Sequence, residues 1–142
     1  MKKNKQSLVS IVIPTFNRGN CIGRAIQSVL DQTYINWEAI IIDNHSEDNT
    51  EDIVRQFQDS RIKSYKIHNN GVIAASRNLA IRNANGEFIA FLDSDDWWMP
   101  RKPEESIRYL DEGADVVYQA AGGTGIGVLQ AAADAGIYGI GV

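Results

Sequence analysis

This sequence is poor in cysteine and has no long hydrophobic run. Cys21 is the only cysteine among 142 residues, which excludes an internal disulfide framework and a thiolate-rich metal site. No apolar run reaches the length of a membrane-spanning helix. The basic first residues are like the start of a signal peptide, but the apolar run after them stops at Pro14 and no small-residue cleavage site follows. We therefore expect a cytoplasmic protein without a transmembrane segment.

The chain also has no excess of basic residues. It contains 14 Lys and Arg against 18 Asp and Glu, which gives a net charge of −4. Domains that bind nucleic acids usually present a strongly basic surface, so we expect no nucleic-acid partner. The length of 142 residues allows one compact domain with a substantial core and is too short for two ordinary domains.

Short runs of β-branched residues alternate with longer amphipathic segments through most of the chain. The short runs predict strands at 8–13, 37–43, 62–67, 87–92 and 114–118. The amphipathic segments predict helices at 22–30, after Asn49, at about 72–84 and at about 102–112. This alternation is typical of a three-layer α/β/α domain with a mostly parallel sheet, which is the fold class that we predict.

Three carboxylates within four positions follow the predicted strand at 87–92. Asp93, Asp95 and Asp96 should therefore lie at the carboxyl edge of the sheet, where open α/β sheets usually bind ligands. Their mutual repulsion is relieved most simply by Mg²⁺ or Mn²⁺, which proteins bind through one or two carboxylates together with substrate phosphates. The alternative is an acidic turn that caps the next helix.

Polar residues also follow the first predicted strand. Pro14, Thr15, Asn17 and Arg18 provide a rigid turn, two hydrogen-bonding side chains and a guanidinium group. A nucleobase or a phosphate can bind to such a loop. The alternative is an ordinary connection between a strand and a helix.

The ends of the second and third predicted strands add further candidates. Asp43 can accept a hydrogen bond from a base N–H or a ribose hydroxyl. Arg77, one turn into a predicted helix after Gly71, is either directed toward the same edge or pairs with a carboxylate on the surface. We interpret His45 and His68 as separate, solvated loop residues rather than metal ligands. Candidates at several strand ends favour a single binding site.

Four segments, taken in order, resemble the nucleotide-binding half of a family 2 glycosyltransferase with the GT-A fold. They are Val12-Ile13-Pro14-Thr15-Phe16-Asn17-Arg18, Ile42-Asp43-Asn44 with Ser46 and Asp48, Gly71 with Ser76-Arg77-Asn78, and Phe91-Leu92-Asp93-Ser94-Asp95-Asp96-Trp97. The resemblance covers about residues 8–118 and implies a Rossmann-like half-domain. It also implies a nucleotide-sugar donor, most often a UDP-sugar, whose sugar is transferred to an acceptor hydroxyl.

The resemblance implies roles for individual residues. The nucleobase is expected to contact Pro14, Thr15 and Asp43, and Arg77 is expected near the base or the phosphates. The ribose is expected near Asp93, and Asp95, with Asp93 beside it, is expected to bind the Mn²⁺ or Mg²⁺ that bridges the diphosphate. The nucleotide-binding residues that we predict are Pro14, Thr15, Asn17, Arg18, Asp43, Arg77, Asp93 and Asp95.

The composition changes at about residue 119. Seven of the twelve glycines lie in 119–142, where Asp134 is the only charged residue. Segment 114–142 resembles part of a substrate-binding protein of the basic-membrane-lipoprotein type. We therefore expect a chimera in which a nucleotide-sugar-binding region at 1–118 is completed by a tail at 119–142. The tail is predicted to form a glycine turn, a helix at about 126–135 and a strand at 137–142, and its apolar surface leaves self-association open.

Members of the transferase family place the general base and the acceptor site in a later half, which does not follow here. The sequence therefore predicts donor binding with a divalent metal, at most slow donor hydrolysis, and no efficient transfer to an acceptor, whose identity stays open. The alternative is a non-catalytic α/β scaffold or binding domain. Metal-dependent affinity for a nucleoside diphosphate distinguishes the two.

Overall fold

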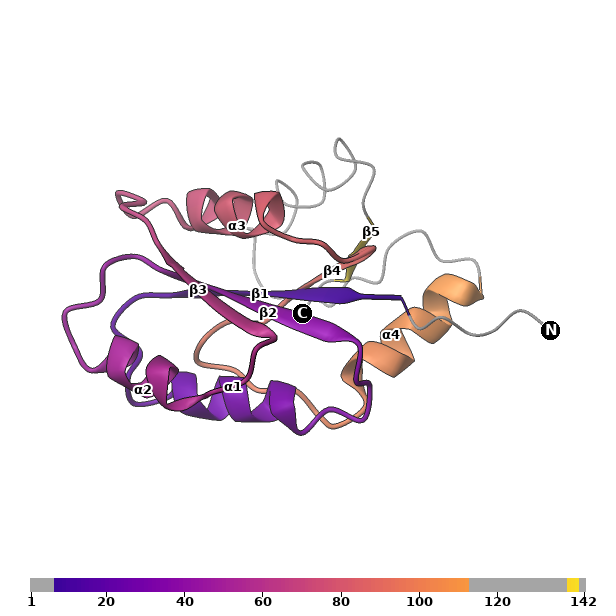
Figure 1. The fold of residues 1–142 in the computed structure, drawn as a ribbon. Coiled ribbons are helices and arrows are strands. Elements are labelled where there is room, and N and C mark those ends of the chain that lie inside the picture. Colours follow the sequence, from indigo (N-terminus) through magenta and orange to yellow (C-terminus); the bar gives the residue numbers. More distant parts are fainter. Residues whose placement is uncertain (1–6, 113–137, 141–142) are drawn as a thin grey trace.

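The computed structural model describes residues 7–112 and 138–140. Strands and helices alternate along these ranges (Figure 1). The elements are β1 Val9–Thr15, α1 Ile22–Leu30, β2 Trp37–Asp43, α2 Thr50–Gln56, β3 Ile62–Lys66, α3 Ile73–Arg82, β4 Phe88–Phe91, α4 Lys102–Asp111 and β5 Tyr138–Ile140. None of the described helices is long and apolar enough to cross a membrane. The cytoplasmic location stays a prediction.

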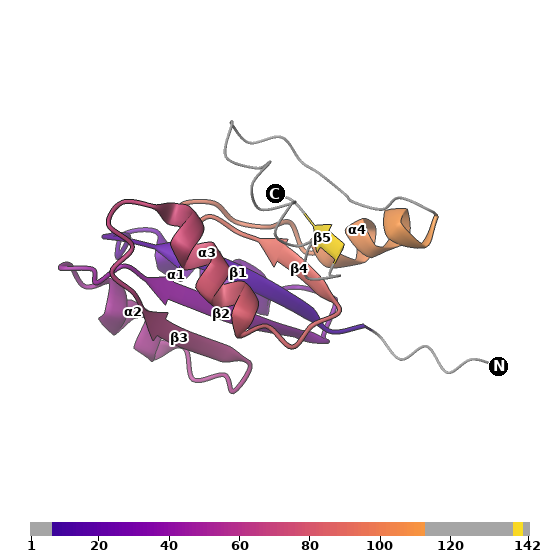
Figure 2. The same cartoon turned by 90° about the horizontal axis from the view of Figure 1, so that it is seen from above.

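The strands form a parallel sheet in the order β3-β2-β1-β4-β5 (Figure 2). Helices α1 and α2 cover one face and α3 covers the other (Figure 1), so the predicted α/β/α class with a parallel sheet is confirmed. From β1 the chain proceeds to β2 and β3 on one side, and then to β4 and β5 on the other. The strand order therefore reverses between β1 and β4, which is where open α/β sheets bind ligands.

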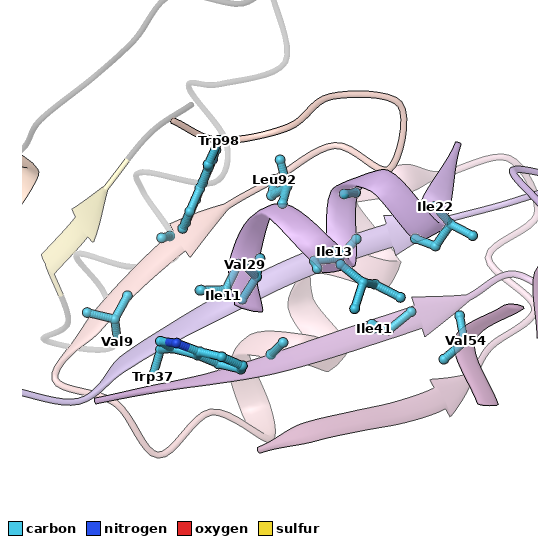
Figure 3. Close-up of a cluster of buried hydrophobic side chains, with 14 of the residues drawn as sticks. Val9, Ile11, Ile13, Ile22, Val29, Trp37, Ile41, Val54, Leu92 and Trp98 are labelled. Atoms are coloured by element: carbon cyan, nitrogen blue, oxygen red, sulfur yellow. The ribbon is translucent and has the colours of Figure 1, made fainter. Parts of the chain in front are cut away.

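Both faces of β1 are buried. Because side chains alternate between the faces of a strand, Val9, Ile11 and Ile13 belong to the larger core cluster with the buried face of α1 and with Trp37 (Figure 3). Val12 belongs to the smaller cluster on the α3 side. Burial on both faces explains why this strand has a nearly continuous apolar sequence.

Helix α1 follows from the spacing of its apolar residues. Ile22, Ala25, Ile26 and Val29 are buried, because residues three and four apart share one face of a helix. Helix α4 has Pro103 in its first turn, where the missing N–H has no intrahelical partner to lose. Both helices therefore form where the sequence predicts them.

Strand β1 extends two residues beyond its predicted end. Pro14 and Thr15 stay in register with Ile42 and Asp43 of β2. On the other side, the pairing with β4 ends at Val12. At Pro14 the strand therefore has a paired neighbour on one side only, and such a position accommodates the missing N–H. Two candidate binding residues consequently lie at the end of a strand rather than in a loop.

The predicted strand at 114–118 and the predicted helix at about 126–135 lie outside the described residues. Strand β5 falls within the predicted last strand at 137–142 and pairs with β4 in parallel. The division of the chain at residue 118, the chimeric origin of the tail and its self-association stay predictions.

Candidate functional site

A cleft of about 360 Å³ opens at the carboxyl edge of the sheet. Its walls come from the ends of β1 and β4, the loops after β2 and β3, and the first turns of α3. The lining residues are Pro14, Thr15, Phe16, Arg18, Asn44, Asn69, Gly71, Ile73, Ser76, Asp93, Ser94 and Asp95. The cleft therefore lies where the strand order reverses, at the ligand-binding position of this fold class.

The structure brings the predicted site residues to this one edge. Five of the eight predicted nucleotide-binding residues line the cleft: Pro14, Thr15, Arg18, Asp93 and Asp95. The other three each adjoin a lining residue: Asn17 precedes Arg18 in the chain, Asp43 pairs with Thr15 in the strand register, and Arg77 is hydrogen-bonded to Asp93. The grouping of strand ends that the sequence predicts is thus present in the fold.

Three buried polar atoms at or beside the cleft have no hydrogen-bond partner within the described part of the chain: Oγ1 of Thr15, Oδ2 of Asp43 and Nε of Arg77. Thr15 and Asp43 face each other in the register of β1 and β2. Thr15 is 5% exposed and Asp43 is 4% exposed. A buried polar atom without a partner costs about 1–3 kcal/mol. A ligand that donates a hydrogen bond to Asp43 and bonds to the Thr15 hydroxyl would remove this cost.

The other carboxylate oxygen of Asp43 is already bonded. Oδ1 accepts hydrogen bonds from the backbone N–H and the hydroxyl of Ser46, at 3.0 and 2.5 Å. The Ser46 hydroxyl accepts one from the backbone N–H of Asn17 at 2.9 Å. The side-chain carbonyl of Asn17 accepts one from the backbone N–H of Glu47 at 2.8 Å. Asn17, a predicted nucleotide contact, therefore links the loops after β1 and β2.

A second set of hydrogen bonds joins the same two loops. The backbone N–H of Arg18 donates to the Thr50 hydroxyl at 2.9 Å, and this hydroxyl donates to Oδ1 of Asp48 at 2.5 Å. The backbone N–H of Gly19 donates to Oδ2 of Asp48 at 3.0 Å. The hydrogen bond from the Thr50 hydroxyl is the main cause that lowers the pKa of the Asp48 carboxyl. The carboxylate form that holds the loops together is thereby favoured.

Arg77 is held inside the wall of the cleft. Its Nη2 donates to Oδ1 of Asp93 at 3.0 Å, and its side chain is 11% exposed. The guanidinium carbon lies 5.6 Å from the centre of the Phe91 ring. Arg77 therefore pairs with a carboxylate, as the alternative prediction for this residue stated. The pair lies in the cleft wall rather than on the open surface. Arg77 acts on a ligand mainly through Asp93 in this arrangement.

Asp95 and Asp96 are both exposed in the acidic turn, but Asp95 lines the cleft and Asp96 does not. The side chain of Asp95 is 58% exposed, and Oδ2 lies 3.8 Å from Nε of Arg18. Its backbone carbonyl accepts a hydrogen bond of 3.5 Å from Nη2 of Arg24, whose guanidinium carbon lies 3.8 Å from the centre of the Trp97 ring. The turn is thus supported from α1, while the carboxylate of Asp95 remains open to the cleft.

A divalent metal at this edge would take Asp95 and Asp93 as its protein ligands. No group of three or more His, Cys, Asp or Glu side chains within residues 7–112 and 138–140 forms a ready-made metal site. Mg²⁺ and Mn²⁺ are commonly held by one or two carboxylates while substrate phosphates supply further oxygens. These carboxylates therefore fit a metal that binds together with a diphosphate better than one bound by protein alone.

Several residues that line the cleft have no role predicted from the sequence, although Phe16, Asn44 and Ser76 lie within the segments that resemble the transferase family. Oδ1 of Asn44 accepts a hydrogen bond from the backbone N–H of Asn69 at 2.9 Å, which joins the loops after β2 and β3. The Asn69 amide donates to the Ser76 hydroxyl of α3, also at 2.9 Å. Phe16 and Ile73 add partly exposed apolar surface. Asn44 comes directly after a predicted strand, and this position could have identified it as a cleft residue. Nothing in the sequence distinguishes Ile73 from other exposed apolar residues.

His45 and His68 are not separate, and this part of the sequence interpretation was wrong. Their rings stack with centroids 3.6 Å apart and an interplanar angle of 6°. Because β2 and β3 are adjacent and parallel, the loops after them run side by side. Both residues are exposed, as predicted, and they belong to no metal-ligating group in the part of the chain that the structure describes.

The loops around the cleft contain left-handed backbone. Asn17, His45 and Asn70 have φ angles of 49°, 50° and 51°, and Gly71 has a φ of 79°. The first three lie in the loops after β1, β2 and β3 respectively. This conformation is uncommon for residues with a Cβ, although Asn and His adopt it more readily than most. At Gly71 the φ angle is one that glycine adopts readily and residues with a Cβ avoid.

Comparison with protein families and curated proteins gives one consistent result. The family model described as "Glycosyl transferase family 2" matches residues 10–133. The chain is 48% identical over 103 residues to UDP-Glc:alpha-D-GlcNAc-diphosphoundecaprenol beta-1,3-glucosyltransferase WfgD of Escherichia coli, covering 72% of this chain and 41% of that protein. It is 42% identical over 104 residues to WfaP of the same organism, a protein with the same described activity, covering 73% and 41%. The chain thus spans less than half the length of these relatives.

Solved structures with the same arrangement include sugar-nucleotide complexes. The structure of S. aureus TarS 1-349 in complex with UDP has a TM-score of 0.72 at 28% identity, over 82% of this chain and 36% of that one. The mannosyltransferase PcManGT from Pyrobaculum calidifontis, in complex with GDP-Man and Mn²⁺, has a TM-score of 0.71 at 23% identity, over 85% and 38%. The second likeness concerns the fold alone.

Proposed function

The chain belongs to glycosyl transferase family 2, and on this premise we propose that its cleft binds the nucleoside diphosphate of a sugar donor, with a UDP-sugar as the donor class. The observation that most directly supports this proposal is the pair of unpartnered buried atoms, Oγ1 of Thr15 and Oδ2 of Asp43. Their positions beside the cleft suit a planar base with an N–H group and a carbonyl oxygen. Uracil has both on one edge, with N3–H between two carbonyl groups.

The apolar part of the cleft suits the face of the same base. Phe16 is 50% exposed and lines the cleft next to Thr15 in the chain. Aromatic rings stack on nucleobases, and such stacking contributes about 1–3 kcal/mol per base in proteins that bind single strands. We assign to Phe16 this contact, in addition to the hydrogen bonds of Thr15 and Asp43.

The diphosphate is assigned to the acidic side of the cleft. Asp95, with Asp93 beside it, would hold Mn²⁺ or Mg²⁺, which neutralises the charge of the diphosphate and so makes it a better leaving group. Arg18, whose Nε lies 3.8 Å from Asp95, places a second positive charge there. The S. aureus structure in complex with UDP supports a nucleoside diphosphate as the ligand.

Glycosyl transfer is proposed for the whole protein, with an acceptor hydroxyl as the second substrate. Donor binding is proposed for the residues described here, because these contain the cleft and the chain spans less than half the length of its relatives. Transfer also needs a group that takes the proton of the acceptor hydroxyl. We assign no residue of the cleft to that role.

Calorimetric titration of UDP into the purified chain, with and without Mn²⁺, tests the proposal. We expect saturable binding that is stronger with the metal, and Asp95→Asn should abolish the effect of Mn²⁺ while the circular dichroism spectrum stays unchanged, because the side chain is 58% exposed. Asp111→Asn, at the exposed end of α4, is the matched control and should behave as the wild type. A folded chain that binds no UDP would contradict donor binding and favour a non-catalytic scaffold.

A further inference from the structure

Ser46 connects the predicted base-binding carboxylate to the loop after β1. Its backbone N–H and its hydroxyl both donate to Oδ1 of Asp43, at 3.0 and 2.5 Å. Its hydroxyl oxygen accepts from the backbone N–H of Asn17 at 2.9 Å. Ser46 is half-buried and lies outside the residues that line the cleft, so its contacts are with the protein.

The direction of each hydrogen bond in this chain of contacts is fixed by chemistry. A backbone N–H can only donate, so Asn17 uses a lone pair of the Ser46 oxygen and leaves the hydroxyl proton for Asp43. Oδ1 of Asp43 thus receives two donors from a single residue. Oδ2 of Asp43, on a residue that is 4% exposed, receives none within the described ranges. Within the described residues, one oxygen of this carboxylate therefore accepts two hydrogen bonds and the other is left for a ligand.

We propose that Ser46 is a positioning residue that sets the base selectivity of the cleft. By holding Oδ1, it fixes the rotation of the Asp43 carboxylate and presents Oδ2 as an acceptor at one position. The proposal rests on the proposed function, because it concerns the base of the nucleotide donor. Its consequence is a preference for a ring N–H, as in uracil, over the ring nitrogen of cytosine, which is an acceptor.

Loss of the Ser46 hydroxyl should reduce this preference and not merely the affinity. A fixed Oδ2 faces N3 of the base, where cytosine offers a lone pair that repels the carboxylate. A carboxylate released from Ser46 can rotate toward the exocyclic amine of cytosine and accept from it. We therefore expect Ser46→Ala to bind UDP more weakly and to discriminate less between UDP and CDP.

The second set of loop contacts provides a matched control. The hydroxyl of Thr50 accepts from the backbone N–H of Arg18 and donates to Asp48, as Ser46 does with Asn17 and Asp43. It joins the same two loops but has no contact with Asp43 among its hydrogen bonds in the described structure. Thr50→Val keeps the shape of this buried side chain and removes its hydroxyl.

The experiment compares the dissociation constants of UDP and CDP in the presence of Mn²⁺ for four proteins, with folding checked by circular dichroism. In the wild type, UDP should bind more tightly than CDP. In Ser46→Ala the ratio of the two constants should fall about tenfold, which corresponds to about 1.4 kcal/mol. Ser46→Thr, which keeps a hydroxyl, should restore most of the ratio. Thr50→Val should weaken the binding of UDP and of CDP by a similar factor.

Three outcomes would overturn the inference. A ratio in Ser46→Ala within twofold of the wild type would show that Ser46 does not set the selectivity. An equal fall of the ratio in Thr50→Val would assign the effect to general loosening of the loops. A wild-type chain that binds no UDP would remove the proposed function together with the inference, whereas the first two outcomes leave donor binding intact. If Ser46→Ala fails to fold, Ser46→Gly, which also lacks the hydroxyl, takes its place in the first of these outcomes.

Discussion

Glu38 allows a quantitative prediction about the edge of the sheet opposite the cleft. This carboxylate is 6% exposed on β2. Oε2 accepts from Nζ of Lys63 at 2.8 Å, and Oε1 accepts from the Ser10 hydroxyl at 2.7 Å and from the backbone N–H of Asn85 at 2.6 Å. A single side chain therefore connects β1, β2, β3 and the turn before β4.

These hydrogen bonds determine the charge state of Glu38. Burial alone would raise the pKa of its carboxyl, but the hydrogen bonds from Lys63, Asn85 and Ser10 outweigh burial and lower the pKa from 4.5 to about 2. A change of one in pKa corresponds to about 1.4 kcal/mol, so the ionised form contributes about 3 kcal/mol to the free energy of unfolding. Because the pKa is lower in the folded state, this contribution is complete above pH 4.5 and is lost as the pH falls toward 2.

Glu38→Gln should therefore lower the free energy of unfolding by about 3 kcal/mol at pH 7. The measurement is urea denaturation followed by circular dichroism, for both proteins, at several values between pH 7 and pH 3. The difference between wild type and variant should shrink to roughly half its neutral value by pH 3, since the wild-type carboxyl is then almost fully protonated in the unfolded state but still mostly ionised in the folded state.

Glu87→Gln is the matched control, because it removes an exposed carboxylate just before β4. It should change the free energy of unfolding by less than about 0.5 kcal/mol. A difference for Glu38→Gln below about 1 kcal/mol at pH 7, or one of the same size at pH 7 and pH 3, would refute the reasoning.

Two further predictions concern a closely packed glycine of this sheet and an arginine in the wall of the cleft. A Cβ at Gly86 would lie 2.6 Å from the carbonyl oxygen of Leu8 and 2.7 Å from the backbone nitrogen of Ser10. Gly86→Ala should therefore lower the free energy of unfolding, measured by urea denaturation, by about 2 kcal/mol. An unchanged free energy of unfolding would contradict this close approach. Arg77→Lys removes the guanidinium whose Nη2 donates to Oδ1 of Asp93 and should weaken UDP binding in calorimetry about fivefold while lowering the free energy of unfolding by about 1 kcal/mol. Full affinity in that variant would mean that any cation suffices at this position.

The sequence was sufficient to predict a mostly parallel sheet and the gathering of the candidate residues at the ends of its strands, because both follow from the alternation of strand and helix patterns. Strand β2, at Trp37–Asp43, has its predicted bounds, since its apolar run at 39–42 lies between polar residues and has few alternatives. Pro14 was predicted to follow the first strand in a rigid turn, whereas it lies within β1. Its actual place in the strand depends on where β4 ends, and local sequence does not contain that information.

The contacts within the site could not be predicted for a related reason. The bond between Asn17 and Ser46 joins two loops and depends on a left-handed backbone at Asn17. The stack of His45 on His68 depends on two strands lying next to each other. Sequence patterns indicate which residues follow each strand, whereas the pairing between loops follows from the strand order and from turn geometry.

The left-handed residues Asn17, His45 and Asn70 have a consequence for ligand-linked stability. Such a conformation costs roughly 1–2 kcal/mol for a residue with a Cβ, and all three are found in loops at the carboxyl edge. The chain therefore loses folding free energy at the edge where the donor is proposed to bind. A ligand that binds only the folded form returns free energy in proportion to the logarithm of its concentration over its dissociation constant. At saturating donor, the nucleotide would then be a structural component of this edge as well as a substrate.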